Sequence, residues 1–410
     1  MSNPGDVQVN SLTIKAAGGT LDLTTSFMSM SIYESIFTPG IVCYINVLDT
    51  DDQIGVIKLV GNEPVSLSIQ VPGGEEQTYN FTVMSHHNDK GVTASMKSKM
   101  YTIKMISDES VHGHLNYTIK PGSTQISNLI KQIVTDLLHS QKNVTVEDTK
   151  GTQNIILNGG MSAHEAMAMI RKRAVSASNK SSFFVFYETR DAGKMAFKFS
   201  TIEQLFQGAS VKTFQQSDAI NSDILAQTDN QILALETPSH FNALEILKGA
   251  ASDVIKYDLT TQTYNKTRTE STLTSYKSGG QGNMLSADAK SKFIDNAKNL
   301  KQHHIVQDNY KDRAVTGIAE SAQDKAAYVS ILAQNSLKFR TYGDFKLIPG
   351  AVVTLNIPTR SSTTDNKDND AQLSGKFLIS RIHHEIGLAS ESPRYTCVVE
   401  CIKGNLEKGA

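Results

Sequence analysis

Residues 28–71 hold the pattern that most constrains the fold, because three consecutive short segments alternate apolar with polar or small residues. The apolar members of the second and third segments each fall on one face: Ile41, Cys43, Ile45 and Val47, then Val65, Leu67, Ile69 and Val71. A period of two residues is that of a half-buried strand. Pro39-Gly40 is a turn signal between the first two segments. The stretch therefore predicts three short strands of an antiparallel sheet.

Similar segments fill the rest of the first 107 residues. The pattern predicts a strand within residues 7–20, a hairpin that turns at Pro72–Glu75 and returns to Val83, and a strand over Met100–Ser107. Short strands at this density are typical of a barrel or a sandwich. We therefore expect a first antiparallel β-barrel domain formed by residues 1–107 together with about 206–236.

The period changes to that of a helix after residues 121–122. Apolar residues from Ile126 to Leu138 follow helical spacing, with Ser123 or Thr124 as the candidate N-cap. Ser162–Glu165 has the form of a capping box at the start of a second helix. Two apolar strands, separated by a turn at residues 191–193, follow this helix. Residues 108–205 are thus predicted to be an α+β insert domain.

Period-two segments return in the C-terminal part of the chain. Residues 237–280 and 339–404 are predicted to form a second β-barrel domain, with a Pro349-Gly350 turn before one of its strands. Between them, residues 281–338 are polar and are predicted to be a helical insert or linker. The expected fold class is α+β, with two antiparallel β-barrel domains that carry α/β and helical inserts.

Composition excludes several classes of function. The formal net charge is −1 at pH 7 and charges of both signs are interleaved, whereas a dedicated nucleic-acid binder carries a basic stripe. No apolar run approaches the roughly 20 residues of a membrane span, and the N-terminus lacks a signal-peptide pattern, so we expect assembly in a cytoplasm. Cys43, Cys397 and Cys401 are predicted to be small core residues.

Three histidine pairs are candidate metal ligands: His86-His87, His303-His304 and His383-His384. Adjacent residues of a strand point to opposite faces, so one pair cannot chelate a single ion. The simpler interpretation is that these are surface or interface histidines. The basic cluster Arg171–Arg173 is interpreted in the same way, as a solvated helix face rather than a DNA contact.

Catalytic signatures are missing from the sequence. Its glycine pairs are not followed by the Lys-Ser/Thr of a phosphate loop, and it has no Gly-x-Ser-x-Gly elbow. We therefore expect no enzyme activity, and we name no catalytic, cofactor-binding or metal-binding residue and no cofactor. A cell-wall hydrolase, or a β module that binds a partner or a carbohydrate, remains the alternative.

Several motifs along the chain resemble one family. They are Tyr33–Pro39 (Tyr-Glu-Ser-Ile-Phe-x-Pro), Leu48-Asp49 with Gly61-x-Glu63, Phe184–Glu188 with Phe197–Leu205, His240–Glu245, and Leu347–Gly350 with Leu373–His383. In this order they resemble the baseplate hub protein of long contractile-tailed bacteriophages, a family related to the N-terminal base of type VI secretion spike proteins.

The resemblance implies a structural role in a virion tail baseplate. Two tail-tube-like barrels per subunit would let three copies form a pseudo-sixfold ring that joins the tail tube to the central spike. The implied partners are two further copies of the chain, a spike or tail-lysozyme protein, and tube-initiating, tube and tape-measure proteins. DNA would only pass through the lumen during genome ejection.

Overall fold

The structure is a computed structural model of the 410-residue chain. It describes residues 5–51, 53–88, 99–116, 122–155, 160–178, 181–191, 193–216, 230–236, 242–258, 261–270, 291–298, 300–307, 336–358, 369–370, 373–389 and 392–403. Within these ranges no helix has both the length and the apolar character required to span a membrane.

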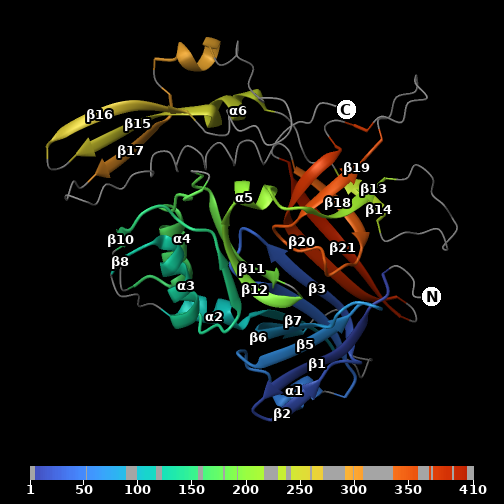
Figure 1. Ribbon diagram of the computed structural model, residues 1–410. Helices are drawn as coiled ribbons and strands as arrows, with labels where there is room; N and C mark the ends of the chain where they lie inside the picture. Colours follow the sequence, from blue (N-terminus) through green and yellow to red (C-terminus); the bar gives the residue numbers. More distant parts are fainter. Residues whose placement is uncertain are drawn as a thin grey trace.

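Three groups of elements follow one another along the chain (Figure 1). The first group contains β1 (Gln8–Ala16), β2 (Gly19–Asp22), β3 (Phe27–Ser35), β4 (Val42–Asp49), α1 (Gln53–Ile57), β5 (Pro64–Gln70), β6 (Gln77–Asn88) and β7 (Lys99–Ser107). The second contains α2 (Asp108–Leu115), β8 (Gly122–Thr124), α3 (Ile126–Asp136), β9 (Asn143–Val146), β10 (Gln153–Ile155), α4 (Ala163–Arg171), β11 (Phe184–Asp191), β12 (Lys194–Thr201) and α5 (Ile202–Phe206).

The third group completes the described chain. It contains β13 (Ser210–Gln215), β14 (Ile232–Glu236), α6 (Ala243–Ala250), β15 (Ala251–Asp258), β16 (Thr263–Glu270), the π-helix η3 (Ser291–Asp295), β17 (Gln302–Gln307), β18 (Ser336–Tyr342), β19 (Val352–Asn356), β20 (Gly375–Ala389) and β21 (Ser392–Ile402).

One 13-stranded sheet joins the first and third groups. Its main path runs β14-β18-β21-β20-β3-β4-β7-β6-β5-β1-β2, and β19 pairs with both β20 and β13. The two groups meet at an antiparallel ladder between β20 and β3, in which Arg381 to Gly387 face Ser35 to Ser29. We call this ladder the seam. Because it consists of backbone hydrogen bonds, it fixes the two groups in one continuous sheet.

The sheet differs from the two expected barrels. Strands β13, β19, β20, β21, β18 and β14 follow one another in pairing, and in the described part of the chain an isolated bridge between Gln215 and Gln231 links β13 back to β14. The strands of the first group follow an open path that ends at β2. The mainly antiparallel character predicted from the sequence is correct, but the pairings of the described residues form no closed barrel.

An extended apolar core lies against this sheet. It draws on both groups of strands, with Ile32, Ile45 and Ile103 from one and Val353 and Val399 from the other, all fully buried. The predicted alternation in residues 41–47 and 65–71 is borne out for the most part, since Cys43, Ile45, Val47, Val65, Leu67 and Ile69 are buried. The three cysteines are free and buried, as expected.

The second group of elements has its own core. Helices α3 and α4 pack with Phe184, Phe186, Phe197 and Phe199 of the β11-β12 hairpin. The capping box predicted at the start of α4 is present, since Glu165 accepts from the Ser162 backbone N–H at 2.8 Å and the Ser162 hydroxyl accepts from the Glu165 N–H at 3.3 Å. The predicted cap of α3 is wrong, because Ser123 and Thr124 lie in β8 and the N-cap is Gln125.

Several strand pairings differ from the expected domain plan, although the domain boundaries themselves stay a prediction. Strands β13 and β14, expected in the first barrel, pair with β19 and β18 of the third group. Strands β15 and β16, expected in the second barrel, lie in a separate sheet, in which β15 pairs with both β16 and β17. Residues 302–307 were expected to be helical and form β17, while residues 308–335 lie outside the described residues. Strand partners are set by contacts distant in sequence, which periodicity does not encode.

Candidate functional site

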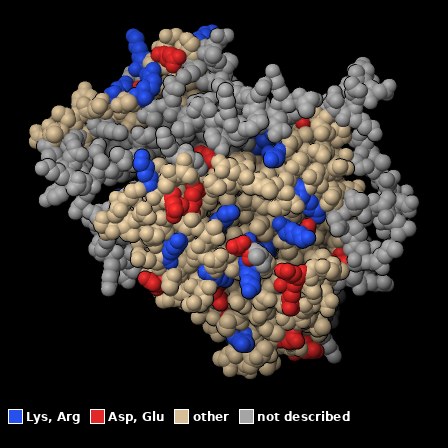
Figure 2. Space-filling model, viewed as in Figure 1, with Lys and Arg blue, Asp and Glu red and all other residues tan. Residues whose placement is uncertain are grey.

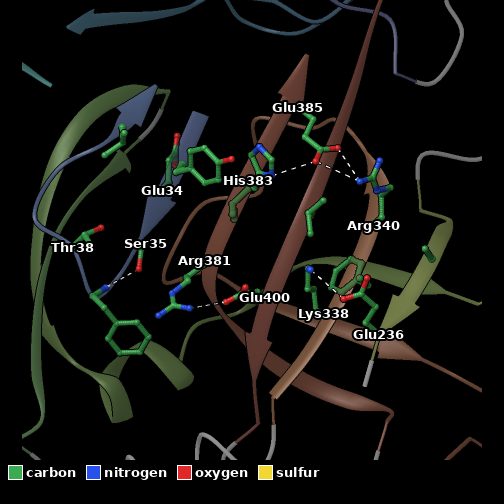
Figure 3. Close-up of a pocket in the computed structure, with 17 residues that line it drawn as sticks. Glu34, Ser35, Thr38, Glu236, Lys338, Arg340, Arg381, His383, Glu385 and Glu400 are labelled. Carbon is green, nitrogen blue, oxygen red and sulfur yellow. Dashed lines mark hydrogen bonds and ion pairs between the residues drawn. The ribbon is translucent and has the colours of Figure 1, made fainter. Parts of the chain in front are cut away.

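The seam carries an open groove on the solvent-facing side of the sheet (Figure 3). Strands β3, β4, β14, β18, β20 and β21 contribute to this groove, which has a volume of about 610 Å³. On β20, Arg381, His383 and Glu385 face the groove because they alternate with the buried Ile382 and His384. We call this hollow the seam groove.

Charged side chains in the seam groove are paired between strands of the sheet. Lys338 lies 3.1 Å from Glu236, Arg340 lies 3.0 Å from Glu385, and Arg381 lies 3.1 Å from Glu400. Figure 3 shows these side chains pointing toward one another over the strands. Exposed pairs of this kind each stabilise a fold by about 0–1 kcal/mol. They therefore give the groove a polar surface with charges of both signs and contribute little to stability.

An aromatic contact marks the centre of the seam. The Tyr33 ring of β3 stacks on the His383 ring of β20, with centroids 4.1 Å apart, and meets Tyr44 of β4 edge-on at 5.9 Å. Burial and the nearby positive charges of His384, Arg340 and Lys338 lower the pKa of His383, although Glu385 opposes them. His383 is therefore mainly neutral at pH 7, which suits a stacked ring.

Under the seam lies a buried polar cluster centred on Arg190. The Arg190 guanidinium of β11 lies 2.9 Å from Glu34 of β3, donates to the Tyr79 hydroxyl of β6, and lies 3.4 Å from the Leu347 carbonyl oxygen. The side chains of Arg190 and Glu34 are 3% and 0% exposed. Breaking a buried pair of this kind is costly, because it leaves a charge without compensation. We call this set, with His384 and Tyr395, the Arg190 cluster.

His384 extends the Arg190 cluster to the third group of strands. Its Nε2 lies 3.6 Å from Glu34, and its Nδ1 lies 2.7 Å from the Tyr395 hydroxyl and 3.3 Å from the Cys397 sulfur. One guanidinium and one imidazole thus link β3, β6, β11, β20 and β21. The cluster places charged contacts where all three groups of elements meet.

Electrostatics keep the Arg190 cluster ionised. Burial alone would raise the pKa of Glu34, but the charges and hydrogen bonds of Arg190 and His384 lower it below its ordinary value. Burial alone would lower the pKa of His384, but its contacts with Cys397 and Glu34 raise it to about 9. The carboxylate is therefore negative and the imidazole mainly positive at neutral pH.

The structure changes the interpretation of the histidine pairs. His384 is fully buried, so its expected surface position is wrong, whereas His383 faces the seam groove and His87 is exposed. The side chains of His303 and His304 lie outside the description, although their backbones belong to β17. Among the described side chains, no group of three or more His, Cys, Asp or Glu residues is placed to hold a metal ion.

Sequence reasoning missed Glu34 and His384, although a signal was present. Glu34 lies between the buried Ile32 and Ile36 at a spacing of two, and His384 lies between Ile382 and Ile386 in the same way. A polar residue in an otherwise apolar strand face is directed into the core. Nothing in the local pattern of β11 identifies Arg190 as their partner.

Charge on the molecular surface is mixed. On the face shown in Figure 2, the basic and acidic side chains of the described residues are interspersed. Arg171, Lys172 and Arg173 lie at the end of α4, and Arg171 and Arg173 are half-buried rather than fully solvated. Hence the interpretation of this cluster as a solvated helix face holds only for Lys172.

No protein-family model matches the sequence, and no curated protein matches it. Solved structures do match. A tail protein from Neisseria meningitidis aligns with a TM-score of 0.55 and 8% identity over 97% of each chain. The 43 kDa tail protein of prophage MuSo2 from Shewanella oneidensis aligns with a TM-score of 0.56 and 12% identity over 96% of this chain and 98% of that one. The protein therefore has the fold of phage tail proteins, and the resemblance inferred from its sequence is confirmed at that level.

Proposed function

We propose that this protein is a structural baseplate hub subunit of a contractile phage tail, without chemistry of its own. Three copies would form a ring of pseudo-sixfold symmetry that joins the tail tube to the central spike. Two observations support the proposal: the shared fold with two phage tail proteins over nearly the whole chain, and the seam between two groups of strands.

The seam is the observation that carries the proposal. A ring that presents six similar sheet modules from three chains needs the two modules of each chain at a fixed spacing. Backbone pairing between β3 and β20 would hold the two modules at this spacing. The buried Arg190 cluster, on the core side of the ladder, would stabilise the same junction. Along the main path the sheet ends at β14 and β2, so these edge strands are where neighbouring subunits would pair.

The partners follow from this role. One face of the ring would bind the spike or tail-lysozyme protein, and the other would bind tube-initiating, tube and tape-measure proteins, with DNA passing through the lumen. The proposed location is the tail baseplate of the virion, after assembly in the cytoplasm of a bacterial host.

The oligomeric state tests the proposal. Light scattering coupled to size-exclusion chromatography should give three times the 44.8 kDa chain mass, alone or after addition of the spike protein encoded by the same phage or prophage. Electron microscopy of that complex should show a ring with six similar modules. A monomer that hydrolyses cell wall would contradict the proposal in favour of a tail-associated hydrolase, and a monomer that binds a polysaccharide would favour a carbohydrate-binding module.

A further inference from the structure

The segment between β4 and β5 has an irregular backbone. Lys58, which follows α1, has φ +57° and Asn62 has φ +78°, both in the left-handed region that residues other than glycine rarely adopt. Gly61, next to Asn62, has φ +103°. Such conformations cost free energy, persist only where surrounding contacts enforce them, and are concentrated at functional sites. We call residues 53–62, which comprise α1 and the loop after it, the α1 segment.

Two buried carboxylates hold the α1 segment in this conformation. Asp49 accepts hydrogen bonds from the backbone N–H groups of the first two residues of α1, at 3.0 Å each. Glu63 accepts from the N–H groups of Val60 at 2.6 Å and of Gly61 at 2.9 Å. Both acids belong to the motifs that carry the family resemblance, and here they fix a loop. A loop that is already ordered loses less conformational entropy when it binds a partner.

Two valines of the α1 segment are largely exposed. Val60 is 87% exposed and Val56 is 73% exposed, whereas Ile54 and Leu59 of the same segment are buried in the core of the sheet. Single exposed apolar residues are common on protein surfaces. Two of them on a loop that is held in a strained conformation indicate a contact surface.

The α1 segment lies at the end of the sheet that β2 forms (Figure 1). A Cβ on Gly18, in the turn before β2, would lie 3.1 Å from the Ile57 carbonyl oxygen, so the segment packs directly on this turn. Along the described pairings β2 has β1 as its one neighbour. A strand that another chain adds to β2 would therefore lie close to the α1 segment.

The opposite end of the sheet carries complementary side chains. Leu233 of β14 is 39% exposed and lies at a register shift in the pairing with β18, and such a bulge redirects a side chain. In the sequence, β14 has one charged residue, Glu236, and the α1 segment has one of opposite sign, Lys58. The Glu236 side chain stays exposed beside Lys338. Apolar side chains and opposite charges are what two surfaces that bind each other present.

We propose that the α1 segment of one subunit binds β14 of a neighbouring copy, with Val56 and Val60 packed against Leu233. This proposal rests on the proposed function, because the contact would join adjacent subunits of the ring. The two surfaces lie at opposite ends of the main strand path and do not pair within one chain. Contact between two different surfaces of identical chains repeats head to tail until a ring closes. A second copy is favoured over an unrelated partner because one chain supplies both surfaces.

Cross-linking of two differently tagged, co-expressed chains tests this contact in the full-length protein, with the spike protein present if assembly requires it. One chain carries Val60→Cys, the other carries Leu233→Cys, and a short bismaleimide joins thiols that lie close together. The three native cysteines are buried and do not compete. We expect a covalent product with both tags, and none from either variant expressed alone. Trimers that give no mixed product, or Val60→Cys chains that link to each other, overturn the proposal.

Val60→Ser tests the same contact by assembly. It should raise the protein concentration at which half of the chains are assembled by about tenfold or more, as measured by light scattering, because it removes buried apolar surface from the contact. Leu244→Ser is the matched control, since Leu244 is 66% exposed on α6, away from both ends of the sheet path. It should assemble like the unmodified protein, and circular dichroism should show that both variants are folded.

The outcomes separate this contact from the ring itself. If the unmodified protein forms trimers and Val60→Ser forms them equally well, the contact is wrong and the ring stands. If the unmodified protein stays monomeric even with the spike protein, the ring and the contact are both wrong.

Discussion

At the scale of single residues, Arg190 connects the most distant parts of the chain. Its guanidinium contacts Glu34, Tyr79 and the Leu347 carbonyl, and its planar fork can serve several acceptors at once. We expect Arg190→Met to lower the free energy of unfolding by about 3–5 kcal/mol, because it leaves the Glu34 carboxylate buried without its partner. Urea denaturation measures this change.

Arg381→Met is the matched control for Arg190→Met, because it removes an exposed pair with Glu400 at a similar distance. Its effect should stay within about 1 kcal/mol. If both variants lose equal stability, the Arg190 cluster does not stabilise the junction more than a surface pair does.

The charge on His384 predicts how stability depends on pH. Its folded pKa of about 9 lies above its ordinary value of 6.5, so the charged imidazole stabilises the fold fully below 6.5. This contribution is lost as the pH rises through about 9. The stability difference between the parent and His384→Gln should therefore shrink from below pH 6.5 to above pH 9 in denaturation curves. A stability difference that does not change over this range would contradict the prediction.

At the scale of elements, the Pro349-Gly350 turn between β18 and β19 lies against Tyr187 of the second group. Gly350 has φ +80°, and a Cβ there would lie 1.9 Å from the Tyr187 hydroxyl oxygen. Gly350→Ala should therefore add a steric clash to a left-handed backbone penalty of roughly 1–2 kcal/mol. Gly73 has φ +76° and nothing within 4 Å, so Gly73→Ala isolates the backbone penalty. Thermal unfolding should show Gly350→Ala as the less stable of the two.

Local patterns in the sequence predict where strands and helices lie better than they predict which strands pair. Alternation identifies β4 and β5, and the Ser162–Glu165 capping box identifies the start of α4, because each signal lies within a few residues. The seam pairs Ser35 with Arg381, and the Arg190 cluster joins β3, β11 and β20. No local period carries such information, so the seam groove and the cluster could not be predicted from one sequence.

At the scale of the whole molecule, the sheet of β15, β16 and β17 packs on a small apolar cluster. Its own core cluster consists of Ala250, Ala251 and Ile294 with Leu247 and Leu300 packed against them, and Tyr264 is 71% exposed. Few buried apolar contacts among the described side chains of this sheet imply a low free energy of local opening. We expect its backbone amides to exchange with deuterium well before those of β3 and β20, as measured by mass spectrometry of proteolytic fragments. Equal protection would mean that this sheet unfolds only with the rest.

The seam also has a consequence for how the protein is made. During synthesis, β3 leaves the ribosome early, whereas its neighbour β20 is translated hundreds of residues later. Until then, the β3 edge is an open template for pairing with any other chain, and such long-range closures are slow. Truncated translation products should therefore aggregate, and recombinant yield should rise when slower growth or a holding chaperone gives the last strands time to arrive.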